Sequence, residues 1–188
     1  MRSLWSAGGR RASQLGAHWR RDRRGVAAVE FAFTVPVLLV VYLAGFEISQ
    51  AMATYRKVSD TTVELANVAA QYTSLGSLDV TSVFNAASQI MAPYPTQNLT
   101  ILLSEITTDA NSNAKVTWSQ PYNGATPLVA NSAVTLPAGL ASPNTSYILV
   151  QTTYLYNPTV GRNFVGSIPI TDQIYMLPRA SSSIPYTG

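Results

Sequence analysis

The most prominent feature of the hydrophobicity pattern is one long apolar stretch near the N-terminus. Between Val26 and Phe46 the sequence reads VAAVEFAFTVPVLLVVYLAGF, 21 residues with a single charged side chain, Glu30. A helix needs about 20 mainly apolar residues to cross the hydrocarbon core of a bilayer. The pattern therefore predicts a membrane-spanning helix over residues 26–46.

The helical pattern continues beyond Phe46, but one side of the helix becomes polar. Apolar or small residues recur every three or four positions, which is the period of an amphipathic helix. They are Ile48, Met52, Tyr55, Thr62, Val63, Ala66 and Ala70. We expect one continuous helix over 26–72, ended by Leu75-Gly76-Ser77 because glycine favours helix ends. Its lower part, the stem 47–74, is expected to pack on the rest of the chain or on a partner helix.

From residue 75 onwards short segments alternate with turn residues. A helix is predicted to open at Asp79 and to run to about Met91, before Pro93 and Pro95. Strands are predicted at 99–108, 114–119, 147–156 and 171–177, which are rich in β-branched and aromatic residues. The continuous apolar start of 147–156 favours a position inside the sheet. Residues 120–144 contain four prolines and are expected to form a long irregular connection.

The body 75–188 is therefore predicted to be α+β. About four strands, most simply antiparallel, pack beside the helical stem, which acts as the spine of the body.

Charge is distributed very unevenly along the chain. The first 24 residues contain seven arginines and one acid, whereas the remainder contains five basic residues and eight acids. Positively charged flanks tend to stay in the cytoplasm, so the basic leader 1–25 is expected there and the body on the far side of the membrane. A basic tail on a mildly acidic body also argues against a nucleic-acid-binding surface.

Two other interpretations of the apolar stretch stay open. It fits a buried core helix, although the charge asymmetry and the terminal position favour the membrane. It also fits a secretory signal cleaved after Ala51-Met52-Ala53, which would make Thr54 the first residue of a secreted or anchored adhesin. The stretch is, however, longer than the usual apolar region of such signals, about 7–15 residues.

A third interpretation comes from a family resemblance. The stretch from Arg23 to Ala32, RRGVAAVEFA, followed by Pro36, resembles the N-terminus of TadE-like proteins of the tight-adherence (Tad/Flp) pilus system. Gly45-Phe46-Glu47, Leu177-Pro178-Arg179 and Trp118 are similar to further features of that family. The specific part of the resemblance covers residues 23–70, and the body matches only loosely.

The resemblance implies a minor pilin, or pseudopilin, with a pilin-like fold. A prepilin peptidase would cut between Gly25 and Val26 on the cytoplasmic side, and the helix would be retained. The implied location is the bacterial inner membrane, single-pass, with a periplasmic body that can enter a pilus. The implied partners are the peptidase, inner-membrane lipid, the major pilin and other TadE- or TadF-like minor pilins. The implied role is initiation, capping or anchoring of the pilus.

Glu30, Phe31 and Pro36 are the residues that the resemblance connects with assembly. A carboxylate inside an apolar span is costly, although Glu30 lies close to the membrane edge and can reach the interface. After cleavage the new α-amine of Val26 would be a cation one turn away. Glu30 would then pair with its own amine or with that of a neighbouring subunit. Pro36 removes one backbone hydrogen bond and is expected to bend the helix.

Other chemistry finds little support in the sequence. Cysteine is absent and His18 is the only histidine, which leaves few ligands for a transition metal. Asp109-x-Asn111-x-Asn113 resembles the start of a calcium loop but has Ala114 at the sixth position and Gln120 at the twelfth, so a hairpin turn is expected instead. We expect no enzyme activity, no cofactor and no metal.

Overall fold

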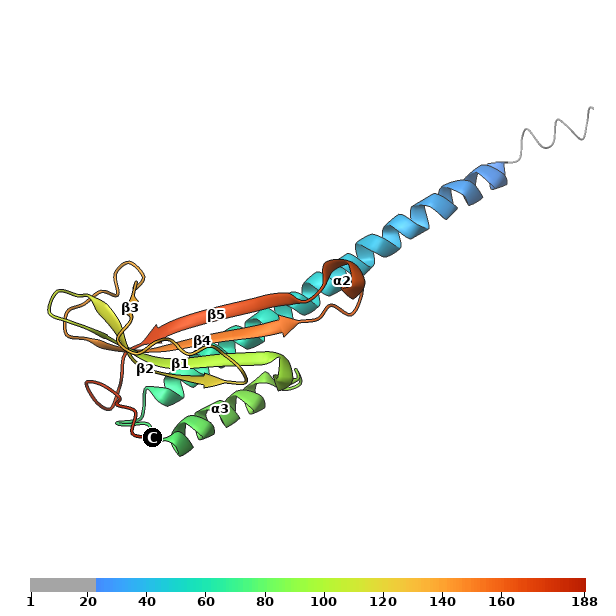
Figure 1. The fold of residues 1–188 in the computed structure, drawn as a ribbon. Coiled ribbons are helices and arrows are strands. Elements are labelled where there is room, and N and C mark those ends of the chain that lie inside the picture. Colours follow the sequence, from blue (N-terminus) through green and yellow to red (C-terminus); the bar gives the residue numbers. More distant parts are fainter. Residues whose placement is uncertain (1–22) are drawn as a thin grey trace, which may run out of the picture. The chain divides into compact units, whose positions relative to one another are not determined.

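The computed structural model describes residues 23–188, which form two compact units. The first unit ends at Phe46, and the second comprises Glu47–Gly188. One helix, α2 (Arg23–Ala69), runs from the first unit into the second (Figure 1). Most of the predicted leader 1–25, including His18, lies outside the described residues.

The long helix predicted over 26–72 is present, with both ends shifted. Helix α2 has 47 residues and ends at Ala69, one turn before the predicted end at Tyr72. Two sets of hydrogen bonds, one local and one from a distant residue, account for the earlier end. The amides of Gln71 and Tyr72 donate to the carbonyls three residues earlier, which tightens and closes the helix. The amide of Arg179 then donates to the carbonyl of Ala70 at 2.8 Å and caps the end.

The second helix, α3 (Ser77–Met91), begins two residues before the predicted start at Asp79. Asp79 is part of the cap: its Oδ2 accepts a hydrogen bond of 2.9 Å from the amide of Gly76, which precedes the helix. Its buried side chains recur at helical spacing, namely Val80, Val83, Phe84, Ala87 and Met91. A short 3-10 turn, η1 (Thr96–Asn98), follows, so the helix ends before the prolines as predicted.

The body contains one antiparallel sheet of five strands in the order β3-β2-β1-β4-β5. The strands are β1 (Leu99–Thr108), β2 (Ala114–Tyr122), β3 (Ala133–Val134), β4 (Ser146–Tyr156) and β5 (Ile168–Met176). Strand β4 lies between β1 and β5, inside the sheet, as its apolar start predicted. Together with the helices this confirms the α+β fold class, a long helix packed on a small antiparallel sheet.

The predicted irregular connection 120–144 is partly wrong. Strand β2 continues through Gln120 and Pro121 to Tyr122, and two residues of the connection form β3. Pro121 is tolerated because β3 pairs with β2 only at Ala114 and Lys115, which leaves β2 an edge strand at its other end. The short helix α4 (Arg162–Val165) was not predicted either.

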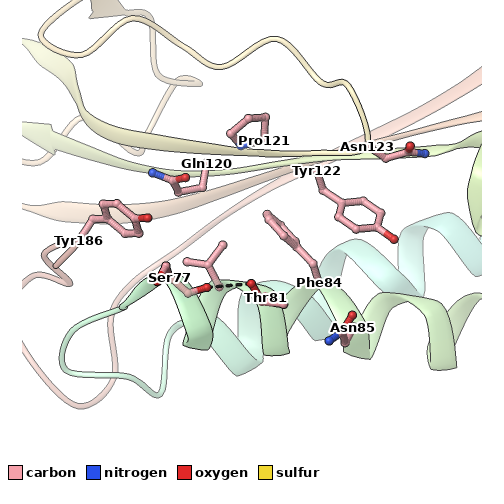
Figure 2. A pocket seen from close by; sticks show the side chains of 10 residues that line it. Ser77, Thr81, Phe84, Asn85, Gln120, Pro121, Tyr122, Asn123 and Tyr186 are labelled. Carbon is pink, nitrogen blue, oxygen red and sulfur yellow. Dashed lines mark hydrogen bonds between the residues drawn. The ribbon is translucent and has the colours of Figure 1, made fainter. Parts of the chain in front are cut away.

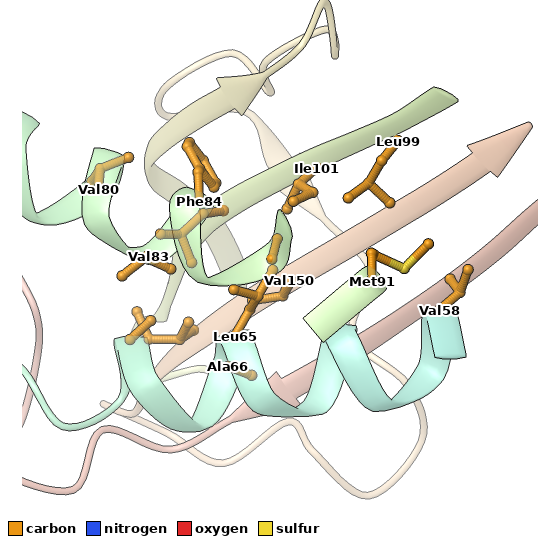
Figure 3. Packing of buried hydrophobic residues seen from close by; sticks show 14 of the residues in the cluster. Val58, Leu65, Ala66, Val80, Val83, Phe84, Met91, Leu99, Ile101 and Val150 are labelled. Carbon is orange, nitrogen blue, oxygen red and sulfur yellow. The ribbon is translucent and has the colours of Figure 1, made fainter. Parts of the chain in front are cut away.

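The main core lies between the two helices and one face of the sheet. Figure 3 shows Leu65 of α2, Phe84 of α3 and Val150 of β4 in this layer, where they belong to one cluster of buried residues. Val58 and Leu65 are fully buried or nearly so, and both lie on the face of α2 that the body covers. Burial of this face, about 25 cal/mol for each Å² of apolar surface, holds the lower part of α2 to the sheet.

The opposite face of the sheet has a smaller cluster at one end only. Ile106, Val116 and Leu149 are buried there under the long 123–145 connection, which contributes Leu136 and Leu140. Beyond this cluster the face carries both polar and apolar side chains, and Gln151 bonds there to Gln173 at 2.8 Å. The alternation of buried and polar positions along β4 therefore changes where the connection stops covering the sheet.

The turn at 109–113 forms as predicted. Asp109 Oδ1 accepts hydrogen bonds from the amides of Asn111 and Asn113, and Oδ2 accepts one from the side-chain amide of Asn113. These bonds, the one from the Asn113 side chain above all, lower the pKa of Asp109. The carboxylate thus closes a hairpin turn.

Candidate functional site

The apolar segment of the first unit is uncovered along its length. Its large side chains are exposed, with Phe33 at 75% and Tyr42 at 70%. Among residues 23–188, α2 is the one helix long and apolar enough to cross a membrane, and none of its most apolar window is buried within the chain. Soluble monomers rarely leave so large an apolar patch in water. This segment needs an apolar environment that the chain itself does not supply.

The predicted processing residues lie at the start of this segment. Gly25 and Val26 are exposed and belong to the first turn of α2, where helix ends fray. A side chain added at Gly25 would meet no other atom within 4 Å. Packing therefore does not demand glycine here. Cleavage between Gly25 and Val26 stays a prediction.

The three predicted assembly residues are exposed on different sides of the same helix. Val26 and Glu30 are one turn apart and share a face, so the proposed partners of an amine–carboxylate pair are neighbours. Phe31 is 69% exposed. Pro36 lies inside the helix and leaves the carbonyl of Ala32 without its usual donor. The structure brings Val26 and Glu30 together but does not gather the other two around them.

The amphipathic stripe predicted beyond Phe46 divides into two parts. Thr62 and Ala66 are buried against the body, as expected. The three positions closest to the apolar span in sequence, which lie on the same flank by helical spacing, are exposed: Ile48, Met52 and Tyr55. Ala66 belongs to the same buried cluster as Val83 and Phe84 of α3, whereas Ile48, Met52 and Tyr55 do not belong to it. An apolar strip therefore remains open directly after the span.

A polar clamp joins the first turn of the second unit to the end of the sheet. Glu47 Oε2 accepts a hydrogen bond of 2.9 Å from the hydroxyl of Tyr156, at the end of β4. Glu47 Oε1 accepts one of 2.6 Å from the amide of Val160, in the following loop. Burial, and then the acceptor carboxylate, raise the pKa of Tyr156 to about 12, so its hydroxyl stays protonated and keeps donating.

A second polar link holds the C-terminal strap, residues 177–188. Glu105 Oε1, almost fully buried, accepts hydrogen bonds from the hydroxyl of Ser146 at 2.7 Å and from the amide of Ile184 at 2.8 Å. Trp118 Nε1 donates to the carbonyl of Ile184, also at 2.8 Å. Nearer the start of the strap, Arg179 Nη2 donates to Asn67 Oδ1 at 2.9 Å.

Sequence reasoning missed the roles of Glu47 and Glu105. A signal was available for both. Glu47 stands between Phe46 and Ile48, and Glu105 is the one charged residue of the strand segment 99–108. A buried carboxylate needs hydrogen-bond donors, so such a position indicates a polar link. The partners lie 109 and 79 residues away for Tyr156 and Ile184, and no local pattern identifies them.

The hollows of the body offer little reactive chemistry. Figure 2 shows one of about 350 Å³ between α3 and β2, into which Phe84, Tyr122 and Tyr186 project. Its other lining side chains are apolar, hydroxyl or amide groups, and Thr81 is already bonded to the carbonyl of Ser77. The residues that line it include no acid, histidine or lysine. Within residues 23–188, no group of three or more acids and histidines gathers as a metal site.

Comparison with protein families identifies the kind of protein that carries these features. Residues 25–67 match the family model described as TadE-like protein. The N-terminal part of the chain, residues 25–67, is therefore TadE-like. Comparisons with curated proteins and with solved structures gave no match.

The TadE-like match begins at Gly25 and ends inside α2. The matched residues therefore include the exposed apolar segment, Glu47 and most of the stem, while α3 and the sheet lie outside the match. The match associates the chain with the Tad pilus system, in which TadE-like proteins are structural components. The exposed helix, rather than a pocket, is the candidate functional site.

Proposed function

We propose that this chain is a minor pilin, or pseudopilin, which initiates, caps or anchors a Tad-type pilus used for surface adhesion. Segment 26–46 is its anchor in the bacterial inner membrane, with the leader 1–25 in the cytoplasm and the body 75–188 in the periplasm. The proposal rests on two observations that concern the same segment: the TadE-like match includes an apolar helix, and the rest of the chain leaves that helix exposed. Lipid covers this apolar surface before assembly, and the helices of neighbouring pilins cover it afterwards.

The partners follow from this surface. The major pilin and other TadE- or TadF-like minor pilins pack helix to helix on 26–46, and the open strip at Ile48, Met52 and Tyr55 extends this packing beyond the membrane. A prepilin peptidase cuts after Gly25. Glu30 then pairs with the freed amine of Val26, in the same chain or in a neighbour, which offsets the desolvation of both charges.

An ordinary secretory signal cut after Ala53 is the competing explanation, and the packing of α2 argues against it. The helix is continuous through Ala53, and Thr54 and Val58 just beyond it are buried in the body. Such a cut would also remove Glu47, which bonds to Tyr156 and Val160. The folded body thus uses residues on the discarded side, which supports a retained helix.

Terminal sequencing of the mature protein, isolated from the membranes of cells with a Tad system, tests the proposal. We expect a chain that begins at Val26. A chain that begins at Thr54 contradicts the pilin proposal and supports conventional secretion, whereas one that begins at Met1 leaves an uncleaved anchor and removes the amine that Glu30 needs. Gly25→Val serves as the matched variant: it should abolish the cut and leave membrane insertion unchanged.

A further inference from the structure

The loop that joins β4 to β5, residues 157–167, differs from the other loops of the body. It contains the short helix α4 and lies at the end of the sheet where β4 ends and β5 begins (Figure 1), and its Val160 amide bonds to Glu47. Val165 is 64% exposed and Val160 40% exposed, and Leu155 and Ile168 at the adjoining strand ends are also open to solvent. Exposed apolar side chains concentrated in one short segment indicate an interaction surface, whereas isolated ones need no explanation.

Exposed large apolar side chains are concentrated at this end of the second unit. Four belong to the loop and the strand ends beside it, and three more lie on the first turns of the stem at Ile48, Met52 and Tyr55. The remaining three of the unit, Leu78, Val129 and Leu177, are scattered singly elsewhere. Most of the exposed apolar side chains therefore lie at the end of the unit that follows the apolar span directly in sequence.

The bond to Glu47 indicates where the loop lies relative to the bilayer. Glu47 is the first residue after the predicted span, and the amide of Val160 donates to its Oε1 at 2.6 Å. A bilayer has about 30 Å of hydrocarbon within a total of about 40–45 Å, so each headgroup layer is about 5–8 Å deep. A span of 21 residues is about 31 Å long at 1.5 Å per residue, which places Glu47 at the inner edge of the headgroup layer. Because the Val160 amide bonds directly to the Glu47 side chain, the backbone of the loop is also expected close to the headgroup layer.

The charge of the loop also fits lipid headgroups. From Leu155 to Thr171 the sequence contains one charged side chain, the exposed Arg162, and no acid. This is notable in a chain whose residues after position 24 include eight acids and five basic residues. Apolar side chains next to an arginine are the composition of segments that lie in a membrane interface, where the guanidinium meets phosphate.

We propose that the 157–167 loop is a second membrane contact, which inserts Val160 and Val165 into the headgroup layer of the outer leaflet and places Arg162 at lipid phosphates. The inference rests on the proposed anchoring by 26–46 and adds a lipid-binding surface to the body. The Glu47 clamp ties the loop to α2, so the body stands on the bilayer through two contacts. When the subunit moves from the membrane into a pilus, the loop must then leave the lipid.

The test uses the full chain, which contains no cysteine, so that one cysteine at a time can be introduced and labelled with an environment-sensitive fluorophore. The labelled protein is placed in nanodiscs of phosphatidylethanolamine and phosphatidylglycerol, with and without lipids that carry a nitroxide either near the headgroup, for position 165, or along the acyl chain, for position 39. Val165→Cys reports the loop and Leu39→Cys the span. Val129→Cys, the same substitution at a valine 73% exposed elsewhere on the body, is the matched control.

We expect nitroxide lipid to quench the label at position 165 as it quenches the label at 39, and to leave the label at 129 unchanged. Quenching at 39, with 165 no more quenched than 129, overturns the lipid contact and leaves the anchor standing. Absence of quenching at 39 overturns the anchor and the inference with it. If the label at 165 responds to the number of protein copies per disc and not to nitroxide lipid, a second copy covers the loop, which also overturns the inference.

Discussion

The indole nitrogen of Trp118 donates a hydrogen bond of 2.8 Å to the carbonyl oxygen of Ile184. This bond joins β2 to the C-terminal strap across 66 residues of sequence. Ile184 is fully buried, and its amide is held separately by Glu105. The strap in turn bonds to the connection after α2, where the amide of Leu75 donates to the carbonyl of Pro185. The strap thereby holds the helices and the sheet together at one end of the body.

Trp118→Phe removes the donor and leaves the Ile184 carbonyl buried without its partner. An unsatisfied buried polar group costs about 1–3 kcal/mol, and the smaller ring leaves additional unfilled space. We expect the free energy of unfolding to fall by about 2–4 kcal/mol, with faster amide hydrogen exchange over the 180–188 segment. Urea unfolding and exchange mass spectrometry of the chain in detergent measure the two effects.

Tyr122→Phe, on the same strand, is the control for that substitution, since its hydroxyl makes no hydrogen bond to any other residue within 23–188. Unchanged exchange in 180–188 for Trp118→Phe would show that the indole does not hold the strap.

The carboxylate of Glu105 is the other half of this link. Glu105→Ala leaves the amide of Ile184 and the hydroxyl of Ser146 without their acceptor, and each bond to a charged group contributes about 1.5–3 kcal/mol. We expect the free energy of unfolding to fall by about 3 kcal/mol or more. Glu105→Gln keeps an acceptor oxygen in the same place and should recover most of the loss. Equal stability of the Ala variant and the wild-type protein in urea contradicts the assignment.

Tyr156 gives the body a distinct alkaline response. Its pKa is raised from 10.0 to about 12 by burial and by the carboxylate of Glu47. Between these values the folded state keeps a proton that the unfolded state has lost. The stability connected with Tyr156 is therefore complete below about pH 10 and falls as the pH rises through about 12. Tyr156→Phe should flatten the decline of unfolding free energy with pH in this range.

The measurement is a series of urea unfolding curves between neutral pH and about pH 12. Tyr55→Phe, at the exposed end of the stem, is the matched control and should keep the wild-type decline. The same slope in both variants would mean that the phenol of Tyr156 titrates as it does in the unfolded chain.

The sequence predicts the elements of this fold better than the links between them. Strand β1 matches its predicted bounds, 99–108, because a proline and an aspartate turn enclose its run of β-branched residues. Strand β3 has no such signal. Its two residues are extended because they pair with Ala114 and Lys115 of β2, which is a property of the tertiary structure. The end of α2 was placed one turn late because its cap is the amide of Arg179, 109 residues beyond Ala70.

The candidate site divides in the same way. The apolar span, Gly25 and Glu30 lie in one short stretch and carry a pattern that can be read locally. The Glu47 clamp depends on Tyr156 and Val160, which the fold alone brings to the stem. Ile48, Met52 and Tyr55 show the converse. Their spacing predicts a buried face, but tertiary packing decides how much of that face is covered, and these three side chains stay exposed.

Glu30 is the residue whose substitution tests the proposed assembly step most directly. If its carboxylate pairs with the amine of Val26 in an apolar environment, loss of one partner leaves the other charge buried alone, at a cost of about 3–5 kcal/mol. Glu30→Ala and Glu30→Gln should then both reduce pilus assembly severely, because the charge rather than the size of the side chain matters. Glu64→Ala, an exposed acid on the same helix, should assemble normally.

Filament yield, together with resistance of the chain to extraction from membranes by carbonate, separates assembly from insertion. We expect Glu30→Ala to stay membrane-embedded and to be cut after Gly25, with few filaments formed. Normal assembly by the Gln variant would contradict charge pairing, because the amide has the size of the carboxylate but no charge to offer the amine. Loss of membrane embedding in both variants would instead assign Glu30 to insertion, which an exposed side chain near the start of α2 gives no reason to expect.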